Sequence, residues 1–233
     1  MVETVSDGRV GFVSVRHAGG VRVLTLLGPA AREEYLALVA PVAPAIESAL
    51  SDRVVAHRVA WCEDDPPTLR LRPWRIERRA FALRLRDLLA GASTIAIADV
   101  RRCYASISPS TVERVLGELG VGSASEVGAF LSRLERAGGR GLPVGPQASA
   151  VLANAVLASA DEALRAAGVA HLRWVDDVVM AAAGPSDAER AIAVLGDAVA
   201  GLGLRLNERK TRIDPPDGGV GLAGSARAVW REG

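Results

Sequence analysis

Cysteine and long apolar runs are both scarce in this chain of 233 residues. The two cysteines, Cys62 and Cys103, lie far apart and form no CxxC pair, which indicates neither a disulfide framework nor a zinc site and suits a reducing compartment. The longest nearly uncharged apolar run, residues 148–160, has 13 residues, too few to span a bilayer. The N-terminal residues lack the apolar region of a signal peptide. These absences predict a soluble, cytoplasmic protein with no membrane partner.

Lysine is nearly absent, because only Lys210 among the 28 basic residues is a lysine and the others are arginines. The abundance of alanine, arginine, glycine and valine is typical of a GC-rich coding bias that replaces lysine with arginine wherever either serves. We therefore interpret Lys210 as a position where arginine does not serve. A lysine can release a proton near neutral pH when its surroundings lower its pKa, whereas arginine effectively cannot.

The net charge of +1 offers little long-range attraction to nucleic acid. Locally, however, residues 68–86 contain seven arginines and a single acid, Glu77. The helical spacing of two stripes predicts an amphipathic helix over residues 73–89, with Trp74, Phe81, Leu85 and Leu88 on its apolar side and Arg72, Arg75, Arg79 and Arg86 outside. The basic face has two interpretations: an ordinary solvated surface, or a groove wall that contacts the phosphates of a nucleic acid.

Strand and helix signals alternate along a chain that is 49% hydrophobic and can bury one core or two interleaved ones. Residues 11–27 read as a hairpin, and residues 32–50 as a helix interrupted by Pro41 and Pro44. Capping-box pairs, a serine followed three residues later by a glutamate, predict helix starts at Ser110, Ser123 and Ser186. The further predictions are a strand over residues 93–98, a helix over 147–167, a hairpin over 172–182, and short strands over 204–206 and 220–222.

The stretch RWVDDVVM places Asp176 and Asp177 side by side between two apolar runs. Burying two adjacent carboxylates is costly unless a cation neutralises them. Asp99 directly follows the predicted strand over residues 93–98. If that strand and the hairpin are neighbours in one sheet, three carboxylates converge at its edge. Such a cluster of hard oxygen ligands is typical of a Mg²⁺ site.

Four segments, in order, resemble the motifs of bacterial reverse transcriptases related to group II intron, retron and phage-defence enzymes. IAIADVRRCYASI is similar to the first motif, and GLPVGPQASAVLAN to the second, in which a glycine-rich loop opens a long helix. RWVDDVVM is similar to the third, a two-aspartate hairpin, and GLRLNERKTRI to the fourth, where a lysine follows a Leu-x-Leu-Asn strand. GLAGS faintly resembles the primer grip. The resemblance extends from about residue 20 to residue 224.

The resemblance implies an RNA-directed DNA polymerase, a nucleotidyltransferase that uses two Mg²⁺ ions, for which Mn²⁺ can substitute. Asp99 and Asp176 are then expected to bridge both ions, with the backbone carbonyl of Val100 as a further ligand and Asp177 as an auxiliary acid. Lys210 matches the position that protonates the leaving pyrophosphate.

The same resemblance implies roles in binding the incoming nucleotide. Tyr104, five residues after Asp99, matches the aromatic gate that excludes a 2′-hydroxyl, although a tyrosine of the core would look the same in sequence. Gly145 would let the backbone approach the nucleotide. Arg22 matches an arginine that clamps the triphosphate, and an exposed strand arginine is about as good an interpretation.

The implied fold is α+β, a polymerase palm of the ferredoxin-like split βαβ type, whose antiparallel sheet carries helices on one face. We expect a reduced, fingers-like region over residues 1–90, including the arginine-rich helix, and the palm over residues 91–233. Only 19 residues follow Asp214, so no helical thumb is evident.

Three departures from the family pattern suggest the abortive-infection and defence-associated branches. Val144 replaces a glutamine, Trp174 replaces a tyrosine, and Pro146 follows Gly145 where serine is common. We expect dNTPs and an RNA or DNA template-primer as substrates, and a protein partner that supplies a thumb or a primer. Two alternatives to templated synthesis stay open: template-independent or protein-primed DNA synthesis in phage defence, and a non-catalytic scaffold that binds nucleic acid.

Overall fold

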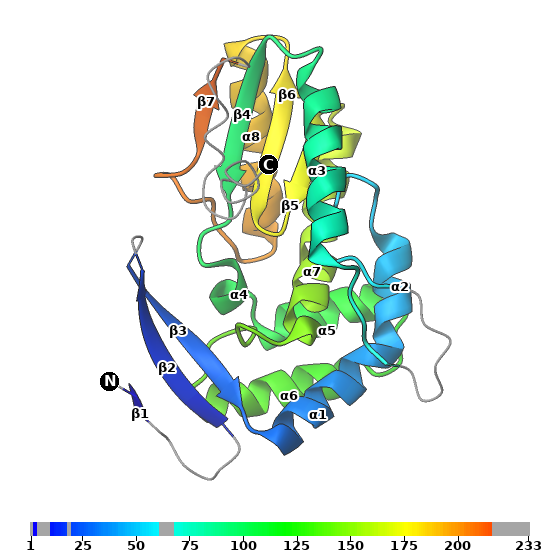
Figure 1. Cartoon of the computed structure of the whole chain (residues 1–233), viewed down its shortest axis with the longest axis vertical. Helices are drawn as coiled ribbons and strands as arrows, with labels where there is room; N and C mark the ends of the chain where they lie inside the picture. The colour runs from blue at the N-terminus through cyan, green and yellow to red at the C-terminus, as the bar shows by residue number, and fades with distance from the viewer. Residues whose placement is uncertain (1, 4–9, 18–19, 61–67, 216–233) are drawn as a thin grey trace. The chain divides into compact units, whose positions relative to one another are not determined.

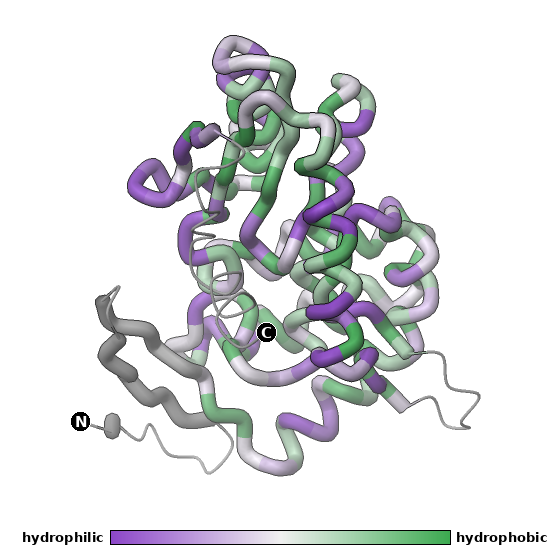
Figure 2. The backbone as a smooth tube through the Cα atoms, turned by 45° about the horizontal axis from the view of Figure 1, so that its top comes forward, coloured by the Kyte–Doolittle hydropathy of each residue, from purple (hydrophilic) through white to green (hydrophobic). Residues whose placement is uncertain are grey.

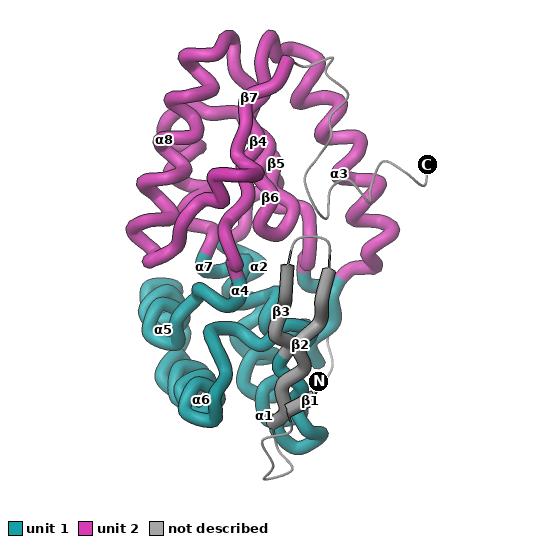
Figure 3. The backbone as a smooth tube through the Cα atoms, turned by 90° about the vertical axis from the view of Figure 1, so that its left-hand side faces the viewer, with its two compact units in different colours: residues 1–49, 59–71, 104–156 teal, residues 50–58, 72–103, 157–233 magenta. Residues whose placement is uncertain are grey.

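A computed structural model describes residues 2–3, 10–17, 20–60 and 68–215, and the chain divides into two compact units. Unit 1 comprises residues 1–49, 59–71 and 104–156, and unit 2 comprises residues 50–58, 72–103 and 157–233 (Figure 3). The arginine-rich helix belongs to unit 2, where it packs on the sheet. The long helix α7 (Gln147–Ala166) begins in unit 1 and ends in unit 2.

Unit 2 is built on a four-stranded antiparallel sheet with the strand order β5-β6-β4-β7. Its strands are β4 (Thr94–Asp99), β5 (Ala170–Trp174), β6 (Asp177–Ala182) and β7 (Arg212–Asp214). The short, partly charged edge strand β7 gave no strand signal in the sequence. Of the strand expected over residues 204–206, only a bridge between Leu206 and Val100 forms, and residues 220–222 lie outside the described part of the chain.

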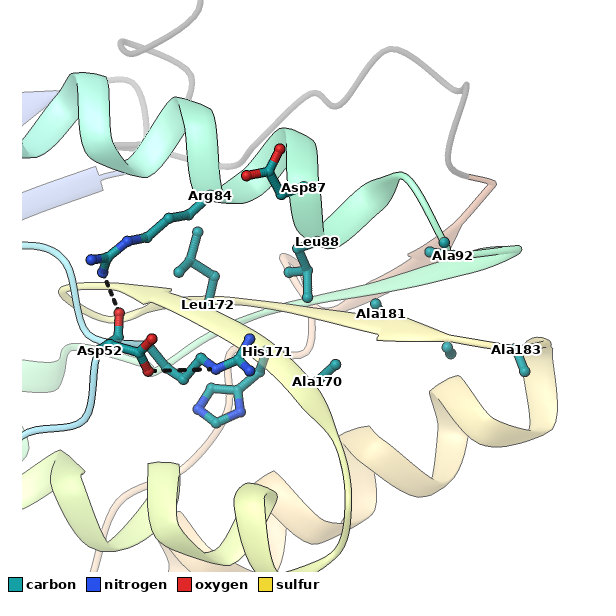
Figure 4. A pocket seen from close by; sticks show the side chains of 13 residues that line it. Asp52, Arg84, Asp87, Leu88, Ala92, Ala170, His171, Leu172, Ala181 and Ala183 are labelled. Carbon is teal, nitrogen blue, oxygen red and sulfur yellow. Dashed lines mark hydrogen bonds and ion pairs between the residues drawn. The ribbon is translucent and has the colours of Figure 1, made fainter.

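Helices α3 (Trp74–Leu89) and α8 (Pro185–Gly201) lie on opposite faces of this sheet (Figures 1 and 4). Phe81 and Leu85 of α3 pack against Ile97, Leu172 and Val179 in a buried core. In Figure 2 the strands of this sheet are largely hydrophobic, whereas hydrophilic and hydrophobic residues alternate along α3. The predicted α+β palm with an antiparallel sheet and helices is confirmed, and α3 adds a helix on the second face.

Unit 1 contains a three-stranded antiparallel sheet, β1 (Val2–Glu3), β2 (Val10–His17) and β3 (Gly20–Leu27), which confirms the predicted hairpin. The predicted interrupted helix consists of α1 (Pro29–Val39), the 3₁₀ turn η1 (Ala40–Val42) and α2 (Ala43–Ala49). Pro41 and Pro44 lack the N–H groups that a continuous helix needs. Among the helices that the structure describes, none combines the length and the hydropathy that a bilayer crossing requires.

Three further helices follow β4 in the sequence: α4 (Cys103–Ser106), α5 (Pro109–Glu118) and α6 (Ala124–Arg136). Two predicted helix starts are wrong. Ser108, not Ser110, caps α5 by accepting the N–H of Thr111 at 3.1 Å, and α8 begins at Pro185, because proline suits the first helical position. The start of α6 after Ser123 is as predicted, but the side chain of Ser123 makes no capping hydrogen bond.

Candidate active site

Two carboxylates lie opposite each other on the central strands of the unit 2 sheet. Asp99 is the last residue of β4, Asp177 is the first residue of β6, and the register pairs them directly. Both residues are buried, with 3% of their surface exposed. Because directly opposed residues of antiparallel strands have Cβ atoms ~4.5–5.5 Å apart, this end of the sheet concentrates negative charge.

The two-residue turn between β5 and β6 carries Asp176. Trp174 pairs with Asp177, so Val175 and Asp176 form the turn. Val175 has a φ of +57°, a left-handed conformation that a β-branched residue rarely adopts, and favoured two-residue turns place glycine or asparagine at positions of positive φ. The carbonyl of Asp176 accepts the N–H of Val100 at 3.0 Å. The turn is thereby tied to the residue that follows Asp99.

Lys210 and Asn207 bind the two carboxylate oxygens of Asp99. Lys210 Nζ lies 2.6 Å from Asp99 Oδ2, and Asn207 Nδ2 donates to Asp99 Oδ1 at 2.8 Å. The N–H of Asn207 also donates to the carbonyl of Asp99 at 2.7 Å. Asn207 is a contact that the sequence analysis did not single out, although it ends the Leu-x-Leu-Asn stretch of the fourth motif. The first and fourth motifs therefore meet at Asp99.

Cys103 lies near the same charges. Burial raises the pKa of its thiol, the negative charge of Asp176 raises it further, and Asp99 adds to the effect, although Arg173 opposes it. The thiol therefore stays protonated at neutral pH and does not act as a nucleophile.

The residues present fit a divalent cation in chemical type. The carboxylates of Asp99, Asp176 and Asp177 and the backbone carbonyl of Val100 are hard oxygen donors, which Mg²⁺ prefers. Among residues 2–3, 10–17, 20–60 and 68–215, however, no three histidine, cysteine or acidic side chains are already grouped to hold a metal ion. Lys210 instead supplies the positive charge at Asp99. Each oxygen of the Asp99 carboxylate has one contact, with Asn207 or with Lys210, and an ionised carboxylate has about four acceptor sites, so Asp99 can also bind a metal ion.

A buried ion pair behind the hairpin was not anticipated from the sequence. Arg173 of β5 is only 1% exposed, and its guanidinium binds Asp161 of α7, with Nε 2.9 Å and Nη2 2.8 Å from Asp161 Oδ2. Burial alone raises the pKa of Asp161, but Arg173 and His171 outweigh it, so that this pKa lies below its usual range. An arginine within an apolar strand signals a buried acidic partner, yet the sequence does not say which acid it is.

The three residues expected to bind the nucleotide belong to unit 1. Tyr104 lies in α4, and its carbonyl accepts the N–H of Leu142 at 2.8 Å. Gly141 permits this contact, because a Cβ there would lie 2.4 Å from the carbonyl oxygen of Tyr104. Gly145 has a φ of +120° with open space around it, so its backbone conformation, not crowding, calls for glycine. Arg22 lies in β3, opposite Val15 of β2.

The outer face of α3 is basic and partly apolar. Glu77, the single acid of the arginine-rich stretch, does not contribute to this face, because it is buried. Its carboxylate accepts hydrogen bonds from the backbone N–H groups of His57 and Arg58 at 3.0 and 2.8 Å. Trp74, predicted to lie on the buried side, is instead 54% exposed, and the guanidinium groups of Arg75 and Arg78 lie 5.8 and 5.0 Å from its ring centre. Ile76 and Leu83 are exposed as well.

A hollow of about 590 Å³ lies between α3 and the β5–β6 strands (Figure 4). Alanine and glycine form much of its lining, with Asp52 and Arg84 at one end, where Arg84 donates to the backbone carbonyl of Asp52. None of the residues expected to act in catalysis or nucleotide binding lines it. The hollow is therefore separate from the candidate active site.

Comparison with known proteins gives a family match and similar solved structures. A family model described as reverse transcriptase (RNA-dependent DNA polymerase) matches residues 35–215, which is more than half of the chain. No curated protein matches the sequence. Among solved structures, telomerase from Candida albicans, in complex with a fragment of telomeric RNA, is similar with a TM-score of 0.55 and 12% identity over 87% of this chain and 41% of that one. Apo telomerase from Candida tropicalis is similar with a TM-score of 0.56 and 12% identity, over 93% and 46% of the two chains. The chain thus spans less than half the length of these telomerases, and the likeness concerns the fold.

Proposed function

Because the chain belongs to the reverse transcriptase (RNA-dependent DNA polymerase) family, we propose that it is a nucleotidyltransferase that adds dNTPs to a 3′-hydroxyl under the direction of an RNA template. The observation that carries the proposal is the 2.6 Å contact between Lys210 and Asp99, next to the paired Asp177. It brings residues of three motifs, far apart in the sequence, to one end of the sheet.

In this proposal Asp99, Asp176 and the carbonyl of Val100 would hold two Mg²⁺ ions, for which Mn²⁺ can substitute. When bound, the ions activate the 3′-hydroxyl and stabilise the leaving pyrophosphate. Asp177, buried and opposite Asp99, adds negative charge that favours cations at this end of the sheet. Lys210 holds a proton on Nζ, close to Asp99, and transfers it to the pyrophosphate as this group leaves.

Nucleotide selection is assigned to unit 1. The ring of Tyr104 would crowd a 2′-hydroxyl and so favour deoxynucleotides, while the backbone at Gly145 would contact the incoming nucleotide. Arg22 would bind the triphosphate as a charged donor. The fixed contact between Leu142 and Tyr104 supports the proposal, because it links the loop of the second motif to the proposed gate.

A second candidate function is template-independent or protein-primed DNA synthesis, as in phage defence. The observation that favours it is Val144, which cannot make the side-chain hydrogen bonds of the glutamine that most of the family carries there. In either case we propose that a nucleic acid or protein partner supplies the primer end, and a protein partner could also supply a thumb.

The deciding experiment incubates the protein with each dNTP or NTP and with Mg²⁺ or Mn²⁺, in the presence and absence of a primed RNA template, and sequences the products. Templated synthesis gives products complementary to the RNA and depends on the primer. The second candidate gives products of fixed or random sequence without template. Nucleic-acid binding with no incorporation under any condition would identify a scaffold and refute both enzymatic proposals.

A further inference from the structure

The hydrogen bonds of Arg173 extend beyond its buried partner to the turn that carries Asp176. While Nε and Nη2 bind Asp161, Nη1 donates to the carbonyl oxygen of Val175 at 2.9 Å. Val175 is the residue of the turn with a φ of +57°. One guanidinium group therefore joins helix α7 to the strained residue that immediately precedes Asp176.

The backbone of Arg173 is also fixed. Its N–H donates to the carbonyl of Arg53 at 2.8 Å, and its carbonyl accepts the N–H of Val55 at 3.1 Å, so residues 53–55 extend the sheet beyond β5. Asp161 and His171, which lie within 3.4 Å of each other, are both buried next to it. With both its backbone and its side chain held, Arg173 can direct the carbonyl of Val175 without moving itself.

We propose that Arg173 and Asp161 are positioning residues that hold Val175 in the left-handed conformation and thereby set the direction of the Asp176 carboxylate. The inference rests on the proposed polymerase function. A β-branched residue leaves this conformation unless its surroundings hold it there. A second contact of the turn, from the Val100 N–H to the carbonyl of Asp176, holds the following peptide, Asp176–Asp177, and not the Val175–Asp176 peptide. Loss of the Arg173 bond frees that peptide to rotate, and Asp176 moves with it.

The geometry calls for arginine and for an acid at these two positions. The planar guanidinium presents donors to Asp161 on one side and to Val175 on another at the same time, whereas a lysine is a single point charge. A buried ion pair alone is weak support for a stabilising role. Its link to the turn gives the pair a use that a pair of apolar side chains could not replace.

The test combines Arg173→Lys and Asp161→Asn with Val175→Gly. Glycine adopts a positive φ without strain, so it removes the need for Arg173 to hold the turn. At saturating dNTP, Arg173→Lys and Asp161→Asn should each lower the single-turnover incorporation rate by about 10- to 100-fold. The nucleotide KM should change little, as expected for misplacement of a reacting group. Adding Val175→Gly should restore about tenfold of that loss.

A control variant separates positioning from stability. Leu164→Ala removes a fully buried side chain of α7 one turn from Asp161, and it should lower the melting temperature without lowering the rate in the folded state. If Val175→Gly restores nothing, or if Leu164→Ala lowers the rate as much as Asp161→Asn does, the proposal is overturned.

A crystal structure of Asp161→Asn decides the question without any activity measurement. The proposal expects Val175 to leave the left-handed region or Asp176 to change direction, and an unchanged turn would overturn it. If the unmodified protein incorporates no nucleotide, the proposed function fails, but this structural comparison still decides whether the pair holds the turn. Should Arg173→Lys not fold, Asp161→Asn and its glycine double variant carry the test.

Discussion

At the scale of single residues, Lys210 has the closest contact of the candidate site, 2.6 Å from Asp99. It is also the only lysine in the chain. The sequence argument that arginine does not serve at this position gains a physical basis, because a compact ammonium lies against a nearly buried carboxylate. Through this contact the positive charge of Lys210 balances the negative charge of the Asp99 carboxylate in the folded chain.

Removing the carboxylate charge should stop nucleotide incorporation. We expect Asp99→Asn and Asp176→Asn each to lower the rate by ~10³, since each loses a ligand to the metal ions. Folding should survive, because asparagine keeps the size of the side chain and Lys210, about one-third exposed, can be solvated when it loses its partner. Primer extension and thermal melting measure the two effects, with the exposed Asp197→Asn of α8 as control. A rate within tenfold of the unmodified protein would remove the residue from its proposed role.

Lys210→Arg tests proton transfer while keeping the charge. If Lys210 protonates the leaving pyrophosphate, pre-steady-state incorporation should fall by ~10²–10³ with little change in dNTP affinity. The rate of the variant should also lose the pH dependence that the lysine gives to the unmodified protein. A variant with an unchanged rate and pH profile would reduce Lys210 to an electrostatic contact.

Tyr104→Ala tests the sugar gate. Because the side chain is expected to crowd a 2′-hydroxyl, its removal should raise the incorporation of NTPs relative to dNTPs. Single-nucleotide incorporation with matched dNTP and NTP pairs measures the ratio, and Tyr104→Phe, which keeps the ring, should preserve it. Equal use of both sugars by the unmodified protein would show that the gate assignment is wrong.

At the scale of the elements, α3 combines an apolar inner side with a basic outer face. Reversing Arg72, Arg75 and Arg79 to glutamate should weaken nucleic-acid binding regardless of sequence and flatten its salt dependence, because fewer phosphate contacts release fewer counterions. Fluorescence anisotropy across a salt series measures both. The matched control reverses three exposed arginines on other helices, Arg114, Arg136 and Arg190, and so changes the net charge equally. An equal effect in the control would refute the assignment of binding to α3.

The helices and strands were largely predictable, because the spacing of apolar residues in the sequence differs between helices and strands. The apolar stripe of Phe81 and Leu85 located α3, and its bounds agree closely with the prediction. The exposure of Trp74 could not be predicted, because its spacing places it on the same stripe as Phe81 and Leu85. Packing explains Trp174, which departs from the family pattern. Its ring packs edge to face against the ring of Phe81, with 5.2 Å between the two ring centroids.

Contacts between distant elements were the part of the site that the sequence left open. The motifs predicted that Asp99 and the hairpin aspartates would belong to one site, but nothing local predicted that Asn207 would bind Asp99 or that Asp161 would bind Arg173. These pairs depend on strand order and helix placement, which only the folded chain fixes. A buried charge can be recognised from an apolar context, whereas its partner cannot.

At the scale of the whole molecule, the Asp161–Arg173 pair links helix α7 to the central sheet of unit 2 and should make stability depend on acid. The pKa of Asp161 lies below its ordinary value of 3.8 in the folded state. Its contribution to stability is therefore complete above that value and is lost as the pH falls through the lower, folded-state pKa. Urea unfolding in the acid range should show a shallower pH dependence for Asp161→Asn than for the unmodified protein, and parallel curves would contradict this.

The two compact units are interleaved along the sequence. Three separate segments form unit 2: residues 50–58, residues 72–103, which include α3 and β4, and the residues from 157 onward, within α7. The segments between them belong to unit 1. The family pattern describes motifs in order along the sequence, whereas compactness follows which elements pack together. Asp99, proposed to act in catalysis, therefore belongs to unit 2, whereas Tyr104, the proposed gate, belongs to unit 1, although the two residues are close in the sequence.

The most direct test of the central claim is single-turnover extension of a primed RNA template with dNTPs and Mg²⁺, comparing the unmodified protein with Asp99→Asn. The account predicts extension complementary to the template by the unmodified protein and a rate about 10³-fold lower for the variant. Extension at equal rates by both proteins, or none by the unmodified protein with either Mg²⁺ or Mn²⁺, would contradict it.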